Sequence, residues 1–227
     1  MKLILFDIDG TLLLTGGAGI RAFNRAFSEM YDVENAWEEY DPHGKTDQQI
    51  IIELAREALG YEPSYLERIE IGNRYAKYFS EYIYEMQNFR LMPGIPDLLD
   101  ALREETYTLG IATGNFKVTA DHKLKRGKLD HFFKFGAYGS DAFDRLGMTR
   151  CALHRGLKLT NGKIDVSDVI LIGDARQDVE CGKALGLRVL AVATGSVSRE
   201  KLQELNPGLA LDNLSDLNRV LEFIHAS

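Results

Sequence analysis

The chain has 227 residues, 45% of them hydrophobic, and a formal net charge of −7. This length allows one large domain or a core with a smaller second domain, and the negative charge argues against nucleic acid and anionic membranes as partners. No run approaches the ~20 apolar residues of a membrane span. We expect a cytoplasmic protein, because the N-terminal apolar run is too short for a signal peptide and the two cysteines, Cys151 and Cys181, lack disulfide-framework or metal-ligand spacing.

Short apolar runs that end in polar turns recur along the chain and predict buried parallel strands. The first covers residues 2–6, and later ones lie at 107–112, 169–172 and 187–193, with a weaker one at 135–138. Helical patterns occur at 93–105, 116–126, 148–157, 177–185 and 214–224. This alternation predicts an α/β fold, with a Rossmann-like core in which helices cover both faces of a parallel sheet.

One region breaks the alternation. Between residues 16 and 87 the sequence shows only amphipathic helical patterns, which predict an all-helical domain inserted after the first strand. We therefore expect a core made of residues 1–15 and 88–227 and a helical insert at 16–87. The Gly16-Gly17 pair and the segment 88–94 are the expected hinges.

Polar side chains follow three of the predicted strands. In an open parallel sheet, ligands bind at the carboxyl ends of the strands, so these side chains should meet in one crevice. Several carboxylates crowded together repel one another unless a divalent cation lies between them, and Mg²⁺ prefers such oxygen ligands. A carboxylate held beside a cation stays ionised and can act as a nucleophile. The residues concerned are Asp7, Asp9, Thr113, Asn115, Asp174 and Asp178.

The motifs around these residues resemble those of the haloacid dehalogenase-like hydrolase superfamily, in its phosphoglycolate phosphatase-like branch. They are DIDGT at 7–11, TGN at 113–115 and GDARQD at 173–178, each at the end of a predicted strand and in the family's order. The insert matches the position of that family's helical cap domain. The resemblance therefore covers essentially the whole chain.

The resemblance implies a role for each acidic residue. Asp7 attacks the phosphorus atom and forms an aspartyl phosphate, while Asp9 protonates the leaving oxygen and then activates the water that cleaves the intermediate. Mg²⁺ is bound by the side chains of Asp7 and Asp174 and by the backbone carbonyl of Asp9. Asp178 orients the metal's ligands, either directly or through water.

The resemblance also implies a phosphate-binding set. The Thr113 hydroxyl and the backbone amides of Gly114 and Asn115 hold phosphate oxygens. The family's basic residue is usually a Lys before the helix expected at Met148, and the sequence has no Lys-Pro there. Arg145 is the candidate replacement, and Arg150, already inside that helix, is a weaker one, although Arg and Lys are not equivalent in such a site.

The segment Gly44-Lys45-Thr46-Asp47 in the insert has two interpretations. Lys45, Thr46 and Asp47 could lie on a cap loop that faces the substrate. Alternatively, the segment starts a helix, with Thr46 or Asp47 as its N-cap. The sequence leaves both open.

The function expected is that of a Mg²⁺-dependent phosphomonoester hydrolase for a small phosphorylated metabolite, with phosphoglycolate as the substrate that the family suggests. A phosphosugar mutase would keep both Asp7 and Asp9, and only its products would differ. A 2-haloacid dehalogenase would need neither a metal nor an acid at Asp9. A non-catalytic phosphate- or metal-binding module would be favoured by the loss of Asp7, Asp9 or Asp174, and all three are present. We expect a monomer or a homodimer.

Overall fold

The computed structural model describes residues 2–38, 40–104 and 107–226. These residues form a six-stranded sheet in the order β5-β4-β1-β6-β7-β8, and every neighbouring pair is parallel. The predicted α/β Rossmann-like fold is therefore confirmed. The strands are β1 (Leu3–Phe6), β4 (Thr108–Ala112), β5 (Phe135–Ala137), β6 (Val169–Gly173), β7 (Arg188–Val192) and β8 (Leu209–Leu211).

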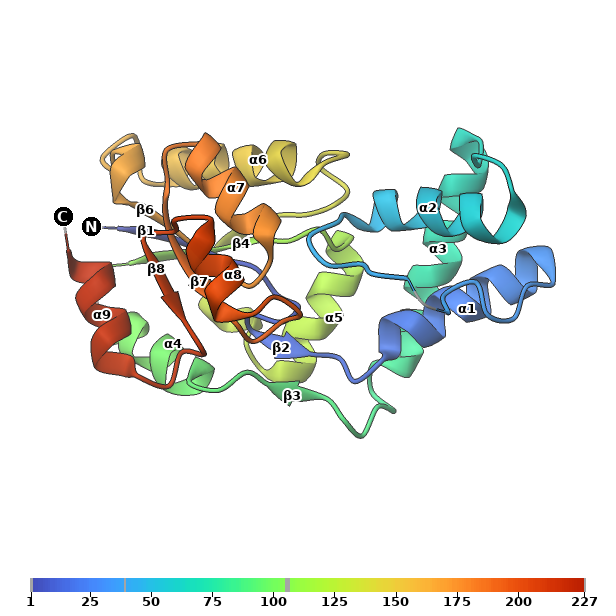
Figure 1. Ribbon diagram of the computed structural model, residues 1–227, viewed down its shortest axis with the longest axis horizontal. Helices are drawn as coiled ribbons and strands as arrows, with labels where there is room; N and C mark the ends of the chain where they lie inside the picture. The colour runs from blue at the N-terminus through green and yellow to red at the C-terminus, as the bar shows by residue number, and fades with distance from the viewer. Residues whose placement is uncertain (1, 39, 105–106, 227) are drawn as a thin grey trace.

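Helices cover both faces of the sheet, which is why its central strands are apolar throughout. In β1, Ile4 and Phe6 belong to the cluster formed with α4 (Ile95–Glu104), α5 (Lys117–Gly127) and α9 (Leu217–His225). Leu3 and Leu5 point to the other face and pack with α6 (Arg145–Leu159). Next to α6, α7 (Arg176–Ala184) and α8 (Arg199–Glu204) cover β7. Figure 1 shows α6 and α7 on one side of the sheet and α4 and α9 on the other.

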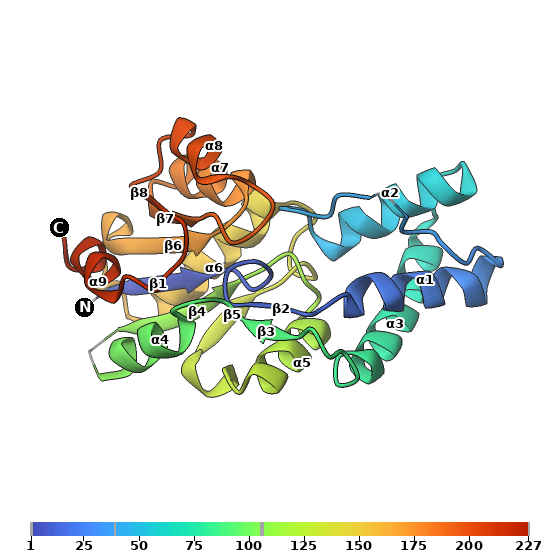
Figure 2. The ribbon, with the colours of Figure 1, turned by 60° about the horizontal axis from the view of Figure 1, so that its bottom comes forward.

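The described residues of the insert form three helices, which gather at one end of the molecule, as Figure 2 shows. They are α1 (Ala18–Tyr31), α2 (Asp47–Leu59) and α3 (Tyr65–Tyr82), and they share an apolar cluster separate from those of the sheet. The chain enters and leaves the insert through the antiparallel pair β2 (Leu13–Leu14) and β3 (Arg90–Leu91). The division of the chain at 15/16 and 87/88 remains our proposal. The strands β2 and β3 lie just outside the insert so defined.

Several boundaries differ from those expected. α6 begins at Arg145 rather than near Met148, because Asp144 is its N-cap and accepts a hydrogen bond from the Gly147 N–H at 2.7 Å. α9 begins at Leu217 rather than at residue 214, with Asp216 as its N-cap. Glu105, the expected last residue of α4's helix, lies outside the described residues.

The strands β2, β3 and β8 and the helix α8 were not predicted, and neither were the 3₁₀ turns at Asp130–Phe132 and Val166–Asp168. All are too short to show a clear periodicity. Both cysteines are free, as expected. Among the helices of the described ranges, none has the length and apolarity to cross a membrane.

Candidate active site

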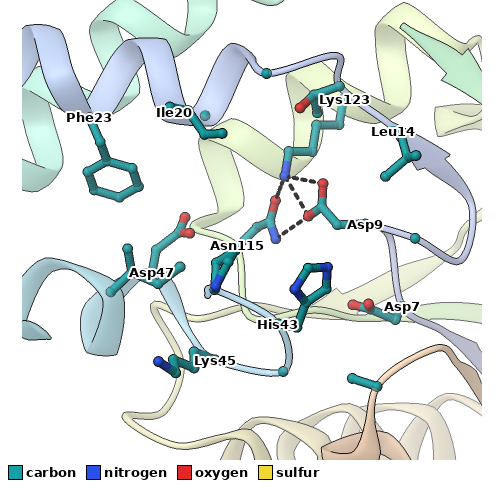
Figure 3. Close-up of a pocket in the computed structure, with 18 of the residues that line it drawn as sticks. Asp7, Asp9, Leu14, Ile20, Phe23, His43, Lys45, Asp47, Asn115 and Lys123 are labelled. Atoms are coloured by element: carbon teal, nitrogen blue, oxygen red, sulfur yellow. Dashed lines mark hydrogen bonds and ion pairs between the residues drawn. The ribbon is translucent and has the colours of Figure 1, made fainter. Parts of the chain in front are cut away.

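A cavity of about 340 Å³ lies between the carboxyl edge of the sheet and the insert. Figure 3 shows the side chains that line it from both sides. The core and the insert therefore meet over the residues that the sequence singled out. From the core, the lining includes Asp7, Asp9, Asn115, Lys123, Arg145 and Asp174; from the insert, it includes Ile20, Phe23, Trp37, His43, Lys45, Asp47, Ile50 and Tyr75.

Three buried carboxylates meet at one side of the cavity, and two of them, Asp7 and Asp174, line it. One oxygen from each of Asp7, Asp174 and Asp178 lies within 4.8 Å of the others. Burial raises the pKa of Asp7 to about 6, with Arg145 opposing the rise and the charges of Asp178 and Asp9 adding to it. The pKa of Asp174 is raised for the same main reason and by Asp7 and Asp178. The single guanidinium of Arg145 does not balance three carboxylates, and their hard oxygen ligands fit a divalent cation such as Mg²⁺.

Arg145 supplies the one buried guanidinium at this cluster within the described residues. Its Nε and Nη2 donate to Asp178 Oδ1 at 3.0 and 2.5 Å, and Nη2 lies 2.9 Å from Asp7 Oδ1. That last contact is an ion pair without hydrogen-bond alignment, so Asp7 Oδ1 is buried with no hydrogen bond from any described residue. Arg145 thus lies beside Asp7, whereas Arg150 is exposed, and the role of Arg145 as the family's basic residue stays a prediction.

The DIDGT turn shapes the pocket of Asp174. Thr11 Oγ1 donates to Asp174 Oδ1 at 3.0 Å. Gly10 has a φ of +80°, and a Cβ at this position would collide with the Asp174 carboxylate. Glycine is therefore required here both by the left-handed backbone and by the close approach of a charged group.

Asp9 is held by two side chains that both come from the core. Lys123 Nζ donates to the two Asp9 carboxylate oxygens at 2.8 and 2.6 Å, and Asn115 Nδ2 donates to Oδ2 at 2.8 Å. Lys123 also donates to the Asn115 amide oxygen. Figure 3 shows the three side chains converging above Asp7. This network fixes the orientation of the Asp9 carboxylate.

Lys123 was missed by the sequence analysis, although a signal existed. It is only 5% exposed and belongs to the inward-facing row of α5, which also contains Thr119, Ala120 and Leu124. Lys123 follows Thr119 by four residues and Ala120 by three, so it lies on the same inward-facing side of the helix and is predicted to be buried. A buried lysine needs an anionic partner.

The TGN motif contributes to the cavity through Asn115 alone. Thr113 is fully buried, and its hydroxyl oxygen lies 3.4 Å from the Asn115 backbone N–H. Thr113 and Gly114 are outside the cavity lining. Their role in phosphate binding therefore stays a prediction.

The structure separates the two interpretations of residues 45–47. Thr46 is fully buried and caps α2 in a capping box with Gln49, and its hydroxyl donates to the Phe143 carbonyl at 2.7 Å. The Thr46 hydroxyl is thus engaged away from the cavity, and Thr46 as a substrate contact stays a prediction. Lys45 and Asp47 do line the cavity. Lys45 pairs with Glu53 at 2.6 Å.

Asp47 joins the insert to the core. Its backbone N–H donates to the Gly114 carbonyl at 2.8 Å. Its carboxylate oxygen Oδ2 accepts from the Phe116 N–H at 2.7 Å and from the Thr119 hydroxyl at 3.4 Å. Burial raises the pKa of Asp47 to about 6, while Lys123 acts in the opposite direction.

This shift predicts a pH-dependent gain in stability for Asp47→Asn. The folded-state pKa of about 6 exceeds the ordinary value of 3.8, so the folded protein is penalised as pH rises between these values and carries the full penalty above them. Asn carries no such penalty. We expect the variant to unfold with a free energy higher by about 1–3 kcal/mol at neutral pH and nearly unchanged at about pH 4. Urea unfolding at several pH values measures this, and a pH-independent difference would contradict it.

Comparison with known proteins identifies the class. A family model described as haloacid dehalogenase-like hydrolase matches residues 4–192. The chain belongs to this family of hydrolases, and the resemblance seen in the motifs is confirmed.

Individual relatives extend over nearly the full chain. The chain is 24% identical over 233 aligned positions to "Pyrophosphatase PpaX" of Bacillus cereus (strain Q1), covering 99% of this chain and 98% of that protein. It is similar to a predicted phosphoglycolate phosphatase from Haemophilus somnus, with a TM-score of 0.73, 20% identity and coverage of 97% and 98%. It is also similar to a β-phosphoglucomutase from Clostridium difficile, with a TM-score of 0.76, 16% identity and coverage of 99% and 97%. These structures share its fold.

Proposed function

We propose that the protein is a Mg²⁺-dependent phosphatase that hydrolyses small phosphomonoesters through an aspartyl phosphate on Asp7. The observation that carries the proposal is the buried Asp7 Oδ1, which lies 2.9 Å from Arg145 Nη2 yet has no hydrogen bond from any described residue. A nucleophilic carboxylate needs an unshared oxygen near positive charge. Asp7 Oδ1 meets both conditions, and the Asp7 side chain is part of the cavity lining.

The chain's own residues can perform both halves of the reaction. In the first, an Asp7 oxygen bonds to phosphorus, the bond from phosphorus to the leaving oxygen breaks, and Asp9 gives its proton to that oxygen. In the second, Asp9 takes a proton from water, whose oxygen attacks phosphorus and frees Asp7. Asn115 and Lys123 hold Asp9 in place for both transfers.

Asp7, Asp174 and Asp178 and the backbone carbonyl of Asp9 are the groups that we propose would hold Mg²⁺. When bound, the ion would offset the negative charge of the phosphoryl oxygens. Arg145 balances part of the carboxylate charge and faces the same region. We propose that Asn115, Thr113 and Gly114 contact phosphate oxygens, of which Asn115 already lines the cavity.

Other functions on this fold are less well supported. Asp9 and the acidic cluster are superfluous for a 2-haloacid dehalogenase, and a non-catalytic module would not need an oriented Asp9. A phosphomutase remains the alternative, because two structural neighbours are named β-phosphoglucomutase. Phosphoglycolate is a candidate substrate on the name of another neighbour. We propose a cytoplasmic location, which the two free cysteines fit.

Phosphate release from a panel of phosphomonoesters tests the proposal. The panel includes an aryl phosphate, phosphoglycolate and sugar phosphates, each with Mg²⁺ and with chelator. We expect release with Mg²⁺ and its loss, by at least about 100-fold, with chelator. Full activity after thorough chelation would remove the metal from the mechanism. Conversion of a sugar phosphate to its isomer without phosphate release would favour the mutase.

A further inference from the structure

The insert side of the cavity has a largely apolar wall. Phe23 and Tyr75 stack with their ring centres 3.7 Å apart, and the Trp37 ring centre lies 5.5 Å from that of Phe23. Ile20 and Ile50 line the same region. Such surfaces bind the apolar faces of sugar rings, carbon chains and ammonium groups. The leaving group of a phosphomonoester bound at Asp7 would lie against this wall.

The cations around the cavity are almost all neutralised within the protein. Lys45 pairs with Glu53, Lys123 with Asp9, and Arg145 with Asp7 and Asp178. His43 Nδ1 lies 2.5 Å from Asp41 Oδ1. Among the described lining residues, only Arg90 has no carboxylate partner, and it is exposed on β3 where the chain leaves the insert. The inner part of the cavity therefore offers no unpaired positive charge to a second anion.

Asp47 adds a hydrogen-bond acceptor to this apolar wall. Asp47 is 4% exposed, and both hydrogen bonds to its side chain go to Oδ2. No described residue donates a hydrogen bond to Oδ1. Three described side-chain atoms are both fully buried and without a hydrogen-bond partner, namely Asp7 Oδ1, Arg68 Nε and Arg126 Nη1. Asp47 Oδ1 is not one of them, so it keeps some accessible surface. Oδ1 is therefore open to the cavity. Figure 3 shows the Asp47 carboxylate directed toward the space between Ile20 and Asn115.

A largely buried carboxylate oxygen without a donor is costly, so its natural partner is an O–H or N–H group. We propose that Asp47 determines specificity by accepting a hydrogen bond from a hydroxyl or ammonium group of the substrate's leaving group. The inference rests on the proposed phosphatase function and names its substrate class. The substrate is the phosphomonoester of a neutral or cationic alcohol, such as a sugar, a polyol or an amino alcohol. An anionic leaving group such as glycolate would face Asp47 and Asp9 with no free inner cation.

The variant Asp47→Asn tests this directly. The Asn amide oxygen can keep the bonds from Phe116 and Thr119, while the amide nitrogen replaces the open oxygen, so an acceptor becomes a donor. Matched substrates isolate the effect: glucose 6-phosphate against cyclohexylmethyl phosphate, and ethanolamine phosphate against propyl phosphate, with phosphoglycolate as the anionic case. Asp97→Asn on α4, an exposed residue outside the cavity, is the control variant.

In the wild type we expect kcat/KM to favour at least one donor-bearing substrate over its matched analogue by at least about tenfold, and to favour it over phosphoglycolate. Asp47→Asn should reduce that ratio by at least about tenfold. It should also raise kcat/KM for phosphoglycolate relative to kcat/KM for the preferred substrate. A higher kcat/KM for the sugar phosphate would identify the hydrogen-bond donor as a hydroxyl group, and a higher kcat/KM for ethanolamine phosphate would identify it as an ammonium group.

Two results would overturn the inference while leaving the phosphatase intact. One is a wild-type preference for phosphoglycolate or for the donor-free analogues. The other is an equal loss on every substrate in Asp47→Asn, which would assign Asp47 a purely structural role. Absence of phosphate release from all substrates, the aryl phosphate included, would instead reject the proposed function and the inference with it.

Discussion

Asp7→Asn is expected to reduce turnover by at least about 10⁴-fold, because it removes the nucleophile that we propose with little change in shape. The protein should still fold. Measurable steady hydrolysis by a preparation free of wild-type enzyme would contradict the covalent mechanism. Asp97→Asn, which makes the same chemical change on an exposed part of α4, serves as the matched control.

The same variant should be more stable than the wild type when Mg²⁺ is absent. Burial raises the pKa of Asp7 from 3.8 to about 6, so the folded state loses stability as pH rises through this interval. At neutral pH with chelator, we expect the free energy of unfolding to increase by about 1–3 kcal/mol. Saturating Mg²⁺ should shrink or reverse the difference, because the ion would stabilise the ionised carboxylate. A less stable variant in chelator would show that Asp7 is not the strained group that its surroundings suggest.

Arg145→Ala is expected to have the largest effect on stability. The change leaves the buried carboxylates of Asp7 and Asp178 without their guanidinium. Breaking a buried ion pair from one side costs about 3–5 kcal/mol. For a chain of this size, that corresponds to a Tm lower by roughly 6–20 °C in chelator. Activity should fall with it, because Arg145 faces the nucleophile.

The matched change is Arg145→Lys, which keeps the charge and loses the two-nitrogen contact with Asp178. It should fall between the wild type and Arg145→Ala in both Tm and activity. Mg²⁺ should restore part of the Tm of Arg145→Ala, because a bound cation offsets the charge that the arginine leaves behind. A Tm within about 2 °C of the wild type would mean that the carboxylates are protonated rather than paired.

The sheet and the acidic cluster could be predicted because they depend on local patterns. A strand buried on both faces is apolar at every position, as β1 is, and the residue after it must lie at the ligand-binding edge. Asp7 and Asp174 could therefore be placed at this edge from the positions at which two apolar runs end. Arg145 came from the family resemblance, which places a basic residue before the helix expected at Met148; the structure has that helix begin at Arg145 itself, with Asp144 as the N-cap.

The rest depended on contacts between distant segments. Lys123 reaches Asp9 only because α5 packs beside β1, and this contact joins residues 114 positions apart. Asp47 forms part of the site only because the N-terminus of α2 meets the loop after β4. At the level of sequence, Thr46 and Asp47 were equally suited to capping and to substrate contact. The structure assigns capping to Thr46 through its bond to Gln49.

The network around Asp9 has a kinetic consequence. In the described part of the chain, the side chains bonded to Asp9 come from the sheet's own loops and from α5, and none comes from the insert. In the mechanism that we propose, the two half-reactions make opposite demands, since phosphoryl transfer to Asp7 is favoured by a dry site and hydrolysis of the intermediate consumes a water molecule. An acid–base group assembled entirely on the core keeps its orientation whether or not the insert admits that water. Dephosphorylation of the enzyme therefore need not wait for the insert to return to one position.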